Sequence, residues 1–516
     1  MKHVFLLSCL PLFTVAHVNN HYQHVFQQES TPLSKSVAII GGGAAGTSTA
    51  FWLNNVFSSN NSPIQLSMTI FDRNSYLGGR STTVPIKGDA SRFGSLELGA
   101  SIFVDVNKNL IKATDVFGLK RITPMVQKKN VDTKRPGLGV WNGDEFLFEE
   151  SGGYWDNIKA LWRYGLSPLK FQAKQKQVVQ RFLTFYEAAD HGFESVSDIV
   201  DQLDYKSLLN MTAEAYLKTL GINERFTYEI LQSATRGNYC QDLNALHALA
   251  VMVSMEASHG TWAVEEGNYR IFEEFASRSQ ANIQLNTKIA AVYNITELDS
   301  HGQQIPRFVV EAQNGSKWTF DDVVIASPLK YSGIELSFPF KHEGRDYHTV
   351  HVTLVAGYPN HSYFGRTAET MPSFVVTTGE PLTSRFKDGK APFDTFSVHR
   401  VLENGEDVTK IFSAHVMTDE LLDQMFLNRS WTYHKGWHAF PSLHPVTEVD
   451  SFPSFVLKPN QQEDSGIIYA SAFENFISTM ETQTIAGKNA ARLLYEKWCS
   501  AALKQCQPFG DGWGSY

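Results

Sequence analysis

Cysteine is scarce in this chain, with 4 among 516 residues. Cys9 lies in the N-terminal apolar segment, which leaves Cys240, Cys499 and Cys506 for the rest of the protein. Three cysteines are too few for a fold that depends on disulfides. A bridge between Cys499 and Cys506 would close a small loop, and Cys240 would then remain a thiol. Paired or not, these cysteines do not hold the fold together.

An excess of positive charge is also missing. Lysine and arginine number 45 against 53 aspartates and glutamates, and the formal net charge is -8. A protein that attracts nucleic acid through its overall charge carries a net positive charge. We therefore expect no nucleic-acid partner. The 42% of hydrophobic residues suffice for the large core of an enzyme-sized chain.

Long hydrophobic runs are absent beyond the N-terminus. No stretch reaches the roughly 20 apolar residues of a spanning helix, so we expect no transmembrane segment but allow a peripheral membrane or lipid contact. The apolar run from Val4 to Val15 is short and contains Pro11. It is typical of a signal peptide, predicted at residues 1–16, with a membrane anchor or buried helix as the alternative. Residues 17–34 are polar and aperiodic, which predicts a disordered lead-in.

Six sequons agree with entry into the secretory pathway. Each is an N-x-S/T triplet without a central proline, the acceptor of N-glycosylation. The acceptors are Asn60, Asn210, Asn294, Asn314, Asn360 and Asn428.

A glycine-rich loop follows the first apolar strand, Val37–Ile40, and precedes a predicted helix at residues 47–56. The loop fits G-x-G-x-x-G between a strand and a helix, the context of a dinucleotide site. Gly41 permits the tight turn, Gly43 lets backbone amides approach a pyrophosphate, and Gly46 lets the helix pack on the sheet. The helix N-terminus favours the anion.

A second predicted strand, residues 66–71, ends at Asp72 and completes a βαβ unit of a parallel sheet. An acid at this position accepts hydrogen bonds from a ribose hydroxyl. Its distance from the glycine loop is longer than usual, because residues 58–63 insert a polar loop.

The rest of the chain alternates between helical and strand-like patterns. Residues 158–220 carry apolar side chains at helical spacing and predict a separate cap. Strands are predicted after it at residues 283–293, 307–312, 318–325, 349–357 and 373–376.

Two further segments indicate which dinucleotide cofactor the chain binds. Leu77–Ser81 contains a double glycine followed by Arg80, whose guanidinium suits phosphate or flavin carbonyls. With Glu97–Ser101, this segment resembles the FAD-binding fingerprint of the flavin amine oxidase superfamily, which implies FAD rather than NAD. Other segments that resemble this superfamily are residues 262–268, 322–328, 467–474 and 479–482.

Within that superfamily, several cap segments resemble the prenylcysteine oxidase family. They are residues 140–143, 161–165, 236–239, 242–245 and 262–265, and the resemblance extends from about Lys35 to Trp498. It implies an α/β fold, with a Rossmann-type FAD-binding domain assembled from discontinuous segments and an inserted α+β substrate domain. The FAD domain is expected at residues 35–110, 260–330 and 450–498, the substrate domain at 111–259 and 331–449, and a tail at 499–516.

The resemblance also implies a reaction. Farnesyl- or geranylgeranyl-cysteine would be oxidised at the carbon beside sulfur, with water and molecular oxygen giving cysteine, a prenyl aldehyde and hydrogen peroxide. Such chemistry needs a long apolar pocket beside a flavin and no metal. The family places it in the lysosome or vacuole, with secretion as the alternative.

The site residues follow from these motifs. The expected cofactor-binding residues are Gly41, Gly43, Ala44, Ala45, Gly46, Asp72, Arg73, Gly79, Arg80, Glu97, Gly99, Ala100, Ser101, Glu474, Met480 and Glu481. The candidate acid/base residues are Glu265, Asp242 and Glu474, each also compatible with a structural role. Aromatic residues of the cap, including Trp155, Trp162, Phe182 and Phe185, line a prenyl tunnel or belong to the core.

Two positions depart from the family pattern. Cys240 and Glu266 stand where glycine is usual, and Glu266 would alter the pocket if it faced the substrate. Two alternatives to the implied function stay open. One is a flavin oxidase or desaturase acting on an amine, a polyene or another thioether, and the other is a non-catalytic lipid-binding homologue.

Overall fold

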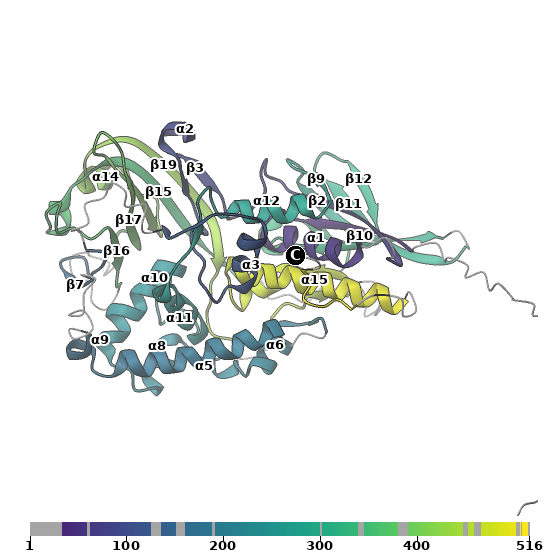
Figure 1. Cartoon of the computed structure of the whole chain (residues 1–516), viewed down its shortest axis with the longest axis horizontal. Coiled ribbons are helices and arrows are strands. Elements are labelled where there is room, and N and C mark those ends of the chain that lie inside the picture. Colours follow the sequence, from purple (N-terminus) through teal and green to yellow (C-terminus); the bar gives the residue numbers. More distant parts are fainter. Residues whose placement is uncertain are drawn as a thin grey trace, which may run out of the picture.

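The computed structural model has two halves joined along its long axis (Figure 1). It describes residues 33–58, 62–124, 136–150, 160–187, 191–299, 302–338, 345–379, 391–446, 452–458, 466–501, 506 and 508–513. The predicted signal peptide, residues 17–32 of the predicted lead-in, Asn60 and Trp155 lie outside these ranges.

One half is built on a six-stranded sheet that begins with the predicted βαβ unit, β1 (Leu33–Ile40), α1 (Ala44–Phe57) and β2 (Ile64–Phe71). β1 pairs in parallel with β2 over its full length, and the amide of Leu33 donates to the Pro63 carbonyl at 2.8 Å. The lead-in predicted to reach residue 34 therefore ends earlier, because Leu33 already belongs to the sheet. The strand order is β20 (Val456–Leu457), β21 (Ile467–Tyr469), β13 (Asp322–Ile325), β1, β2 and β9 (Asn282–Gln284).

Helices cover this sheet closely. α1 packs against α15 (Met480–Ala501) and α12 (Tyr269–Arg278). α3 (Lys108–Val116) packs on α15 and on α12. A Cβ on Gly487 would lie 2.3 Å from Ser48 Oγ and 2.4 Å from the Ala45 carbonyl oxygen. The small residues of α1 and this glycine thus let two helix backbones approach each other.

A four-stranded sheet lies beside the parallel sheet. Its order is β12 (Lys317–Phe320), β11 (Gln304–Ala312), β10 (Ile289–Leu298) and β14 (Glu335–Leu336). Two predicted strands, residues 283–293 and 318–325, are wrong as single elements. Each is split between the two sheets, since Asn286 has a φ of 53° and Asp321 separates β12 from β13.

The other half contains a seven-stranded mixed sheet (Figure 1). It joins residues 138–149 to residues 347–441, two segments far apart in the sequence. The order is β19 (Phe426–Pro441), β15 (Tyr347–Pro359), β18 (Asp407–Ser413), β17 (Thr395–Val401), β16 (Phe374–Thr377), β6 (Leu138–Trp141) and β7 (Phe146–Glu149).

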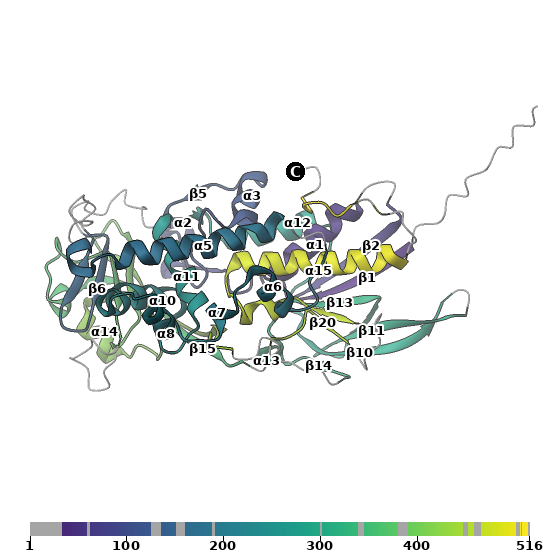
Figure 2. The ribbon, with the colours of Figure 1, turned by 90° about the horizontal axis from the view of Figure 1, so that it is seen from below.

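A helical layer lies below this sheet, and Figure 2 shows its longest helix, α5 (Ser167–Glu187), lying across the molecule. This layer agrees with the predicted helical cap. Its other helices are α6 (Val196–Leu203), α7 (Lys206–Leu209), α8 (Ala213–Thr219), α9 (Glu224–Phe226), α10 (Gln232–Tyr239) and α11 (Ala248–Ser254).

Short elements connect the two halves. They are the β3 (Thr83–Pro85) and β4 (Ser95–Glu97) pair with α2 (Ala90–Phe93) between them, the β5 (Arg121–Ile122) and β8 (Ala263–Val264) pair, and α13 (Leu329–Ser332). The helix α14 (Asp419–Met425) packs on the seven-stranded sheet, at the outer end of its half (Figure 1).

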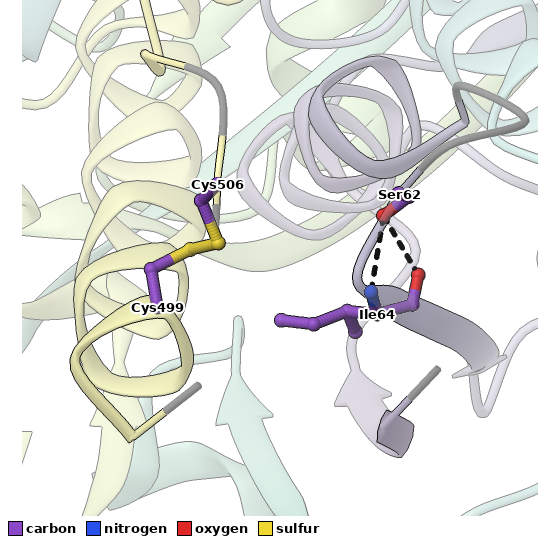
Figure 3. Close-up of a disulfide and its surroundings, with 4 residues drawn as sticks. All are labelled: Ser62, Ile64, Cys499 and Cys506. Carbon is purple, nitrogen blue, oxygen red and sulfur yellow. Dashed lines mark hydrogen bonds between the residues drawn. A yellow bond between two sulfur atoms is a disulfide. The ribbon is translucent and has the colours of Figure 1, made fainter. Parts of the chain in front are cut away.

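The C-terminal residues pack on the first half. Cys499 and Cys506 form a disulfide at the end of α15 (Figure 3). Cys240 is a buried free cysteine. Phe509 and Trp513 are buried, and the Trp513 ring lies 6.1 Å from the Trp52 ring in an edge-to-face arrangement. The segment predicted as a tail therefore contributes to the core around α1.

Candidate active site

A cavity of about 1690 Å³ runs between the two halves of the molecule. Its lining begins at the glycine loop, passes the N-terminus of α15 and reaches the seven-stranded sheet and the helical layer. A typical site for one small ligand occupies roughly 300–1,000 Å³. The cavity therefore has room for a dinucleotide and a second molecule.

The glycine loop forms one end of this cavity. A Cβ on Gly41 would lie 2.6 Å from the Ala326 carbonyl oxygen, and a Cβ on Gly46 would lie 1.9 Å from the Gly41 carbonyl oxygen. Gly43 differs, because its Cβ would meet no protein atom closer than 3.8 Å. The first two glycines satisfy the fold, whereas Gly43 keeps the cavity wall open to a ligand.

Asp72 lies at the end of β2, beside the loop. Its carboxylate accepts from the amides of Gly42 and Asn74, each at 2.7 Å. Burial raises the pKa of Asp72, and these two amides act in the opposite direction. A carboxylate has about four lone-pair sites, so Asp72 can still accept from a ribose hydroxyl in the cavity, which it lines together with Arg73.

Arg80 and Glu474 form a buried ion pair in the wall of the cavity. The other Glu474 oxygen accepts from the Tyr347 hydroxyl, and Arg80 Nη1 donates to the Ala439 carbonyl at 2.6 Å. Glu474 is 1% exposed and comes from the 3-10 helix at Ala470–Asn475. Each Glu474 oxygen holds one donor, so Glu474 positions Arg80 and Tyr347 in the wall, and its role as a general acid or base stays a prediction.

The segment after β4 supplies Gly99, Ala100 and Ser101 to the cavity wall. A Cβ on Gly99 would lie 2.5 Å from the Trp437 ring. Glu97 does not line the cavity, and its side chain accepts from the Asn268 amide instead. The prediction of Glu97 as a direct cofactor ligand is therefore corrected to a supporting role under the wall.

The N-terminus of α15 points at the cavity, which Met480 and Glu481 line. Glu481 accepts from the Asn109 and Leu110 amides at 2.9 and 3.0 Å and from the Tyr186 hydroxyl at 2.5 Å. Burial raises the pKa of Glu481 to about 7, against the effect of these donors. Glu481 thus joins the first turns of α3 and α15.

Three cavity-lining residues have a buried polar atom without a partner among the described residues, and two of these atoms, Ser81 Oγ and Gln483 Nε2, lie near the predicted fingerprints. Buried polar groups are almost always hydrogen-bonded. Both residues flank the predicted fingerprints, Ser81 beside Arg80 and Gln483 beside Glu481. Because both atoms are closed to solvent, they lie behind the cavity surface, beside the predicted fingerprints.

The model for the family described as prenylcysteine lyase matches residues 148–507, and the model of an NAD(P)-binding Rossmann-like domain matches residues 39–116. The chain belongs to the prenylcysteine lyase family. Its fold is the predicted α/β class, with a Rossmann-like domain and a second, mixed-sheet domain, and the family is one of oxidoreductases.

Curated relatives align over nearly the whole chain. Farnesylcysteine lyase of Arabidopsis thaliana is 29% identical over 480 residues, which cover 90% of this chain and 88% of that protein. Prenylcysteine oxidase 1 of Homo sapiens is 27% identical over 489 residues, covering 90% and 89%. Among solved structures, a putrescine oxidase variant superposes with a TM-score of 0.56 at 13% identity, covering 90% of this chain and all of that one. This last likeness concerns the fold.

Two predicted acid/base residues lie away from the cavity of this family member. Glu265 forms an exposed ion pair with Lys120 at 2.7 Å, and Asp242 binds Arg236 at 2.9 Å. Neither residue lines the cavity. Each carboxylate is engaged by a cation outside the cavity lining, so the structure gives no support to their acid/base roles, which stay predictions.

The structure also shows where Glu266 and Cys240, the two departures from the family pattern, lie relative to the cavity. Glu266 is exposed and pairs with Arg270 at 3.1 Å, so it does not face the cavity. Cys240 lines the cavity and ends α10 with a φ of 48°, a left-handed conformation in which glycine is favoured.

The helical layer gives the cavity an apolar wall. Phe182 lines it together with Val178, Leu249 and Met252. Phe185 is buried in the core, while Trp162 is 87% exposed, so the prediction that Trp162 lines a tunnel or belongs to the core is wrong.

Sequence reasoning missed Lys410 and His399, which line the cavity from adjacent strands β18 and β17. Lys410 Nζ donates to Ser101 Oγ at 2.6 Å and to the Glu97 carbonyl at 3.1 Å. Burial lowers the pKa of Lys410, opposed by the nearby Glu97, and burial lowers the pKa of His399 to about 3. The one available signal was a lysine between buried residues, Thr409 and Ile411, in a strand.

Neither a metal cluster nor a spanning segment is evident where the structure describes the chain. No group of three or more His, Cys, Asp or Glu residues there has the arrangement of a metal site. Likewise, none of the described helices combines the length and apolarity needed to cross a bilayer.

Proposed function

We propose that this chain is an FAD-dependent thioether oxidase that cleaves farnesyl- or geranylgeranyl-cysteine. Oxygen and water would be consumed, and cysteine, a prenyl aldehyde and hydrogen peroxide would be released. One observation carries the proposal: a single cavity joins a dinucleotide loop to an apolar wall, in a member of the prenylcysteine lyase family.

The residues present fit FAD. Gly43 leaves room for the pyrophosphate at the N-terminus of α1, and Asp72 lies where a ribose is expected. When bound, FAD would supply a flavin ring able to accept a hydride from the carbon beside sulfur.

The chain's own residues would orient the substrate and exclude water. Val178, Phe182 and Met252 would pack along a prenyl chain, since each buried methylene contributes about 0.8 kcal/mol. The cysteinyl part would then lie toward the polar side of the cavity, near Lys410 and His399. With its lowered pKa, Lys410 can hold or release a proton at Nζ close to neutral pH.

Turnover with defined substrates tests this proposal. Purified holoprotein would be incubated with farnesylcysteine, geranylgeranylcysteine and a panel of amines that includes putrescine, while peroxide and aldehyde are measured. We expect peroxide and an equal amount of prenyl aldehyde from a prenylcysteine. Peroxide from amines alone would favour an amine oxidase, and a preparation without flavin or without any turnover would favour a lipid-binding homologue.

The compartment is part of the same proposal. The Cys499–Cys506 disulfide is compatible with an oxidising route through the secretory pathway. Lysosome or vacuole is the destination proposed, with secretion as the alternative. Immunolocalisation of the tagged full chain with a lysosomal marker distinguishes the two.

A further inference from the structure

An exposed apolar cluster lies at the start of α5. Ten large hydrophobic side chains are exposed in the described part of the chain, and four of them are Leu161, Trp162, Leu166 and Leu169. Residues 160–164 are helical, Gly165 has a φ of 61° in the turn that follows, and α5 begins at Ser167, so the four side chains lie within nine residues on either side of one turn. These side chains therefore belong to one patch.

The same segment is strongly basic in a chain whose net charge is -8. Residues 160–186 contain five lysines and arginines and no aspartate or glutamate. Arg163 pairs with Glu229 and Arg181 with Asp204. No carboxylate of the described residues lies within ion-pair distance of Lys170 or Lys176, and both lysines are exposed.

The opposite face of this segment lines the large cavity. Ala160, Val178 and Phe182 belong to the cavity wall, and Ala160 directly precedes the exposed Leu161. Thr123 and Glu150 line the cavity and are also exposed, so the cavity reaches the surface there. Figure 2 shows α5 uncovered along the face that is turned toward the viewer.

We propose that residues 160–176, the docking segment, bind the surface of an anionic lipid bilayer. Trp162 and the leucines would enter the interface between headgroups and acyl chains, while Lys170 and Lys176 would contact anionic headgroups. Because the protein as a whole is negative, this basic segment would be attracted to the lipid more strongly than the average surface and would orient the protein on it. A second copy of the same segment is a poor partner, since two basic surfaces repel each other.

Vesicle binding tests the docking segment independently of turnover. Full-length holoprotein would be co-sedimented with vesicles of phosphatidylcholine, with and without phosphatidylserine. We expect binding to the anionic vesicles that falls as salt is raised. Since each surface lysine contributes on the order of fivefold, Lys170→Glu with Lys176→Glu should weaken binding by about 30-fold or more. Trp162→Ser with Leu166→Ser should weaken it roughly tenfold or more.

Matched controls keep the test specific. Lys108→Glu with Lys317→Glu makes the same change in net charge, and Leu298→Ser with Leu427→Ser replaces exposed leucines elsewhere. Both control pairs should bind vesicles like the unmodified protein. Equal binding to neutral vesicles, equal loss in the controls, or unchanged binding by the docking-segment variants would overturn the proposal. The proposal would also be overturned if the docking-segment variants changed their oligomeric state, measured by ultracentrifugation, while their vesicle binding stayed the same.

Discussion

The glycines at positions 41 to 46 serve different purposes at the scale of single residues. Gly41 and Gly46 are required by the protein's own backbone, as contacts of 2.6 and 1.9 Å to a hypothetical Cβ indicate. Gly43 faces free space in the cavity. Identical residues in one motif therefore differ in whether the fold or the ligand requires them.

Two alanine substitutions separate these purposes. Gly46→Ala should lower the free energy of unfolding of the apoprotein by about 3 kcal/mol, because the methyl group overlaps a carbonyl oxygen. Gly43→Ala, whose φ of -86° suits any residue, should cost less than about 1 kcal/mol yet lose bound flavin. Urea unfolding and flavin absorbance of the purified proteins measure the two effects. Comparable destabilisation by both substitutions would contradict this division.

The buried position of Lys410 in the cavity wall lowers the pKa of its amine. Lys410→Met keeps the aliphatic volume and removes the amine, so we expect retained flavin and a fall of about 100-fold in kcat/KM for prenylcysteine. Lys435→Met is the matched control, because Lys435 lines the same cavity but is exposed. A similar loss in both variants would point to a general electrostatic effect of the cavity instead.

Elements far apart in the chain meet at single side chains. Glu481 joins α3 to α15, 372 residues from Asn109, and Gly487 brings α15 onto α1. Predicted strands were correct where one run belonged to one sheet, as in β2, and wrong where one apolar run supplied two sheets. Periodicity along the chain does not indicate which sheet a strand joins, since that depends on turns such as the one at Asn286.

Glu481 should also make stability depend on pH. Its pKa is raised from 4.5 to about 7 in the folded state, so the folded protein retains a proton that the unfolded chain has already lost. This proton therefore contributes to the free energy of unfolding at low pH. The contribution declines as the pH rises between the two pKa values, from 4.5 to about 7. Glu481→Gln should remove that decline. Thermal unfolding of the unmodified protein and the variant, measured below and above this pH range, tests the prediction. If the stability of both proteins changes with pH in the same way, Glu481 is not the group responsible.

The whole molecule places its two halves on either side of one cavity and leaves four of the five sequons in the described residues exposed. Asn210, Asn294, Asn314 and Asn428 are exposed. Asn360 differs, because it is partly buried and its Nδ2 donates to the Gln424 carbonyl at 2.8 Å. Exposure of the amide nitrogen, rather than the triplet alone, determines access by the glycosylation machinery.

Expression in secretory cells tests this expectation. Asn210→Gln should reduce the mass that enzymatic deglycosylation removes, whereas Asn360→Gln should leave it unchanged, because the side-chain amide of Asn360 is already engaged. Mass spectrometry of the intact protein provides the measurement. A glycan on Asn360, or no glycan at any exposed sequon, would contradict the structural reasoning.

The sequence by itself determined the βαβ unit, the glycine loop, Asp72 and the fingerprint at Arg80, because these features depend on residues close together in the chain. Tertiary structure alone decided which charged side chains face the cavity. Arg80 meets Glu474 across 394 positions and Lys410 meets Ser101 across 309, while Glu265 and Asp242 bind cations elsewhere. Such contacts depend on strand order and register between distant segments, which local motifs do not encode.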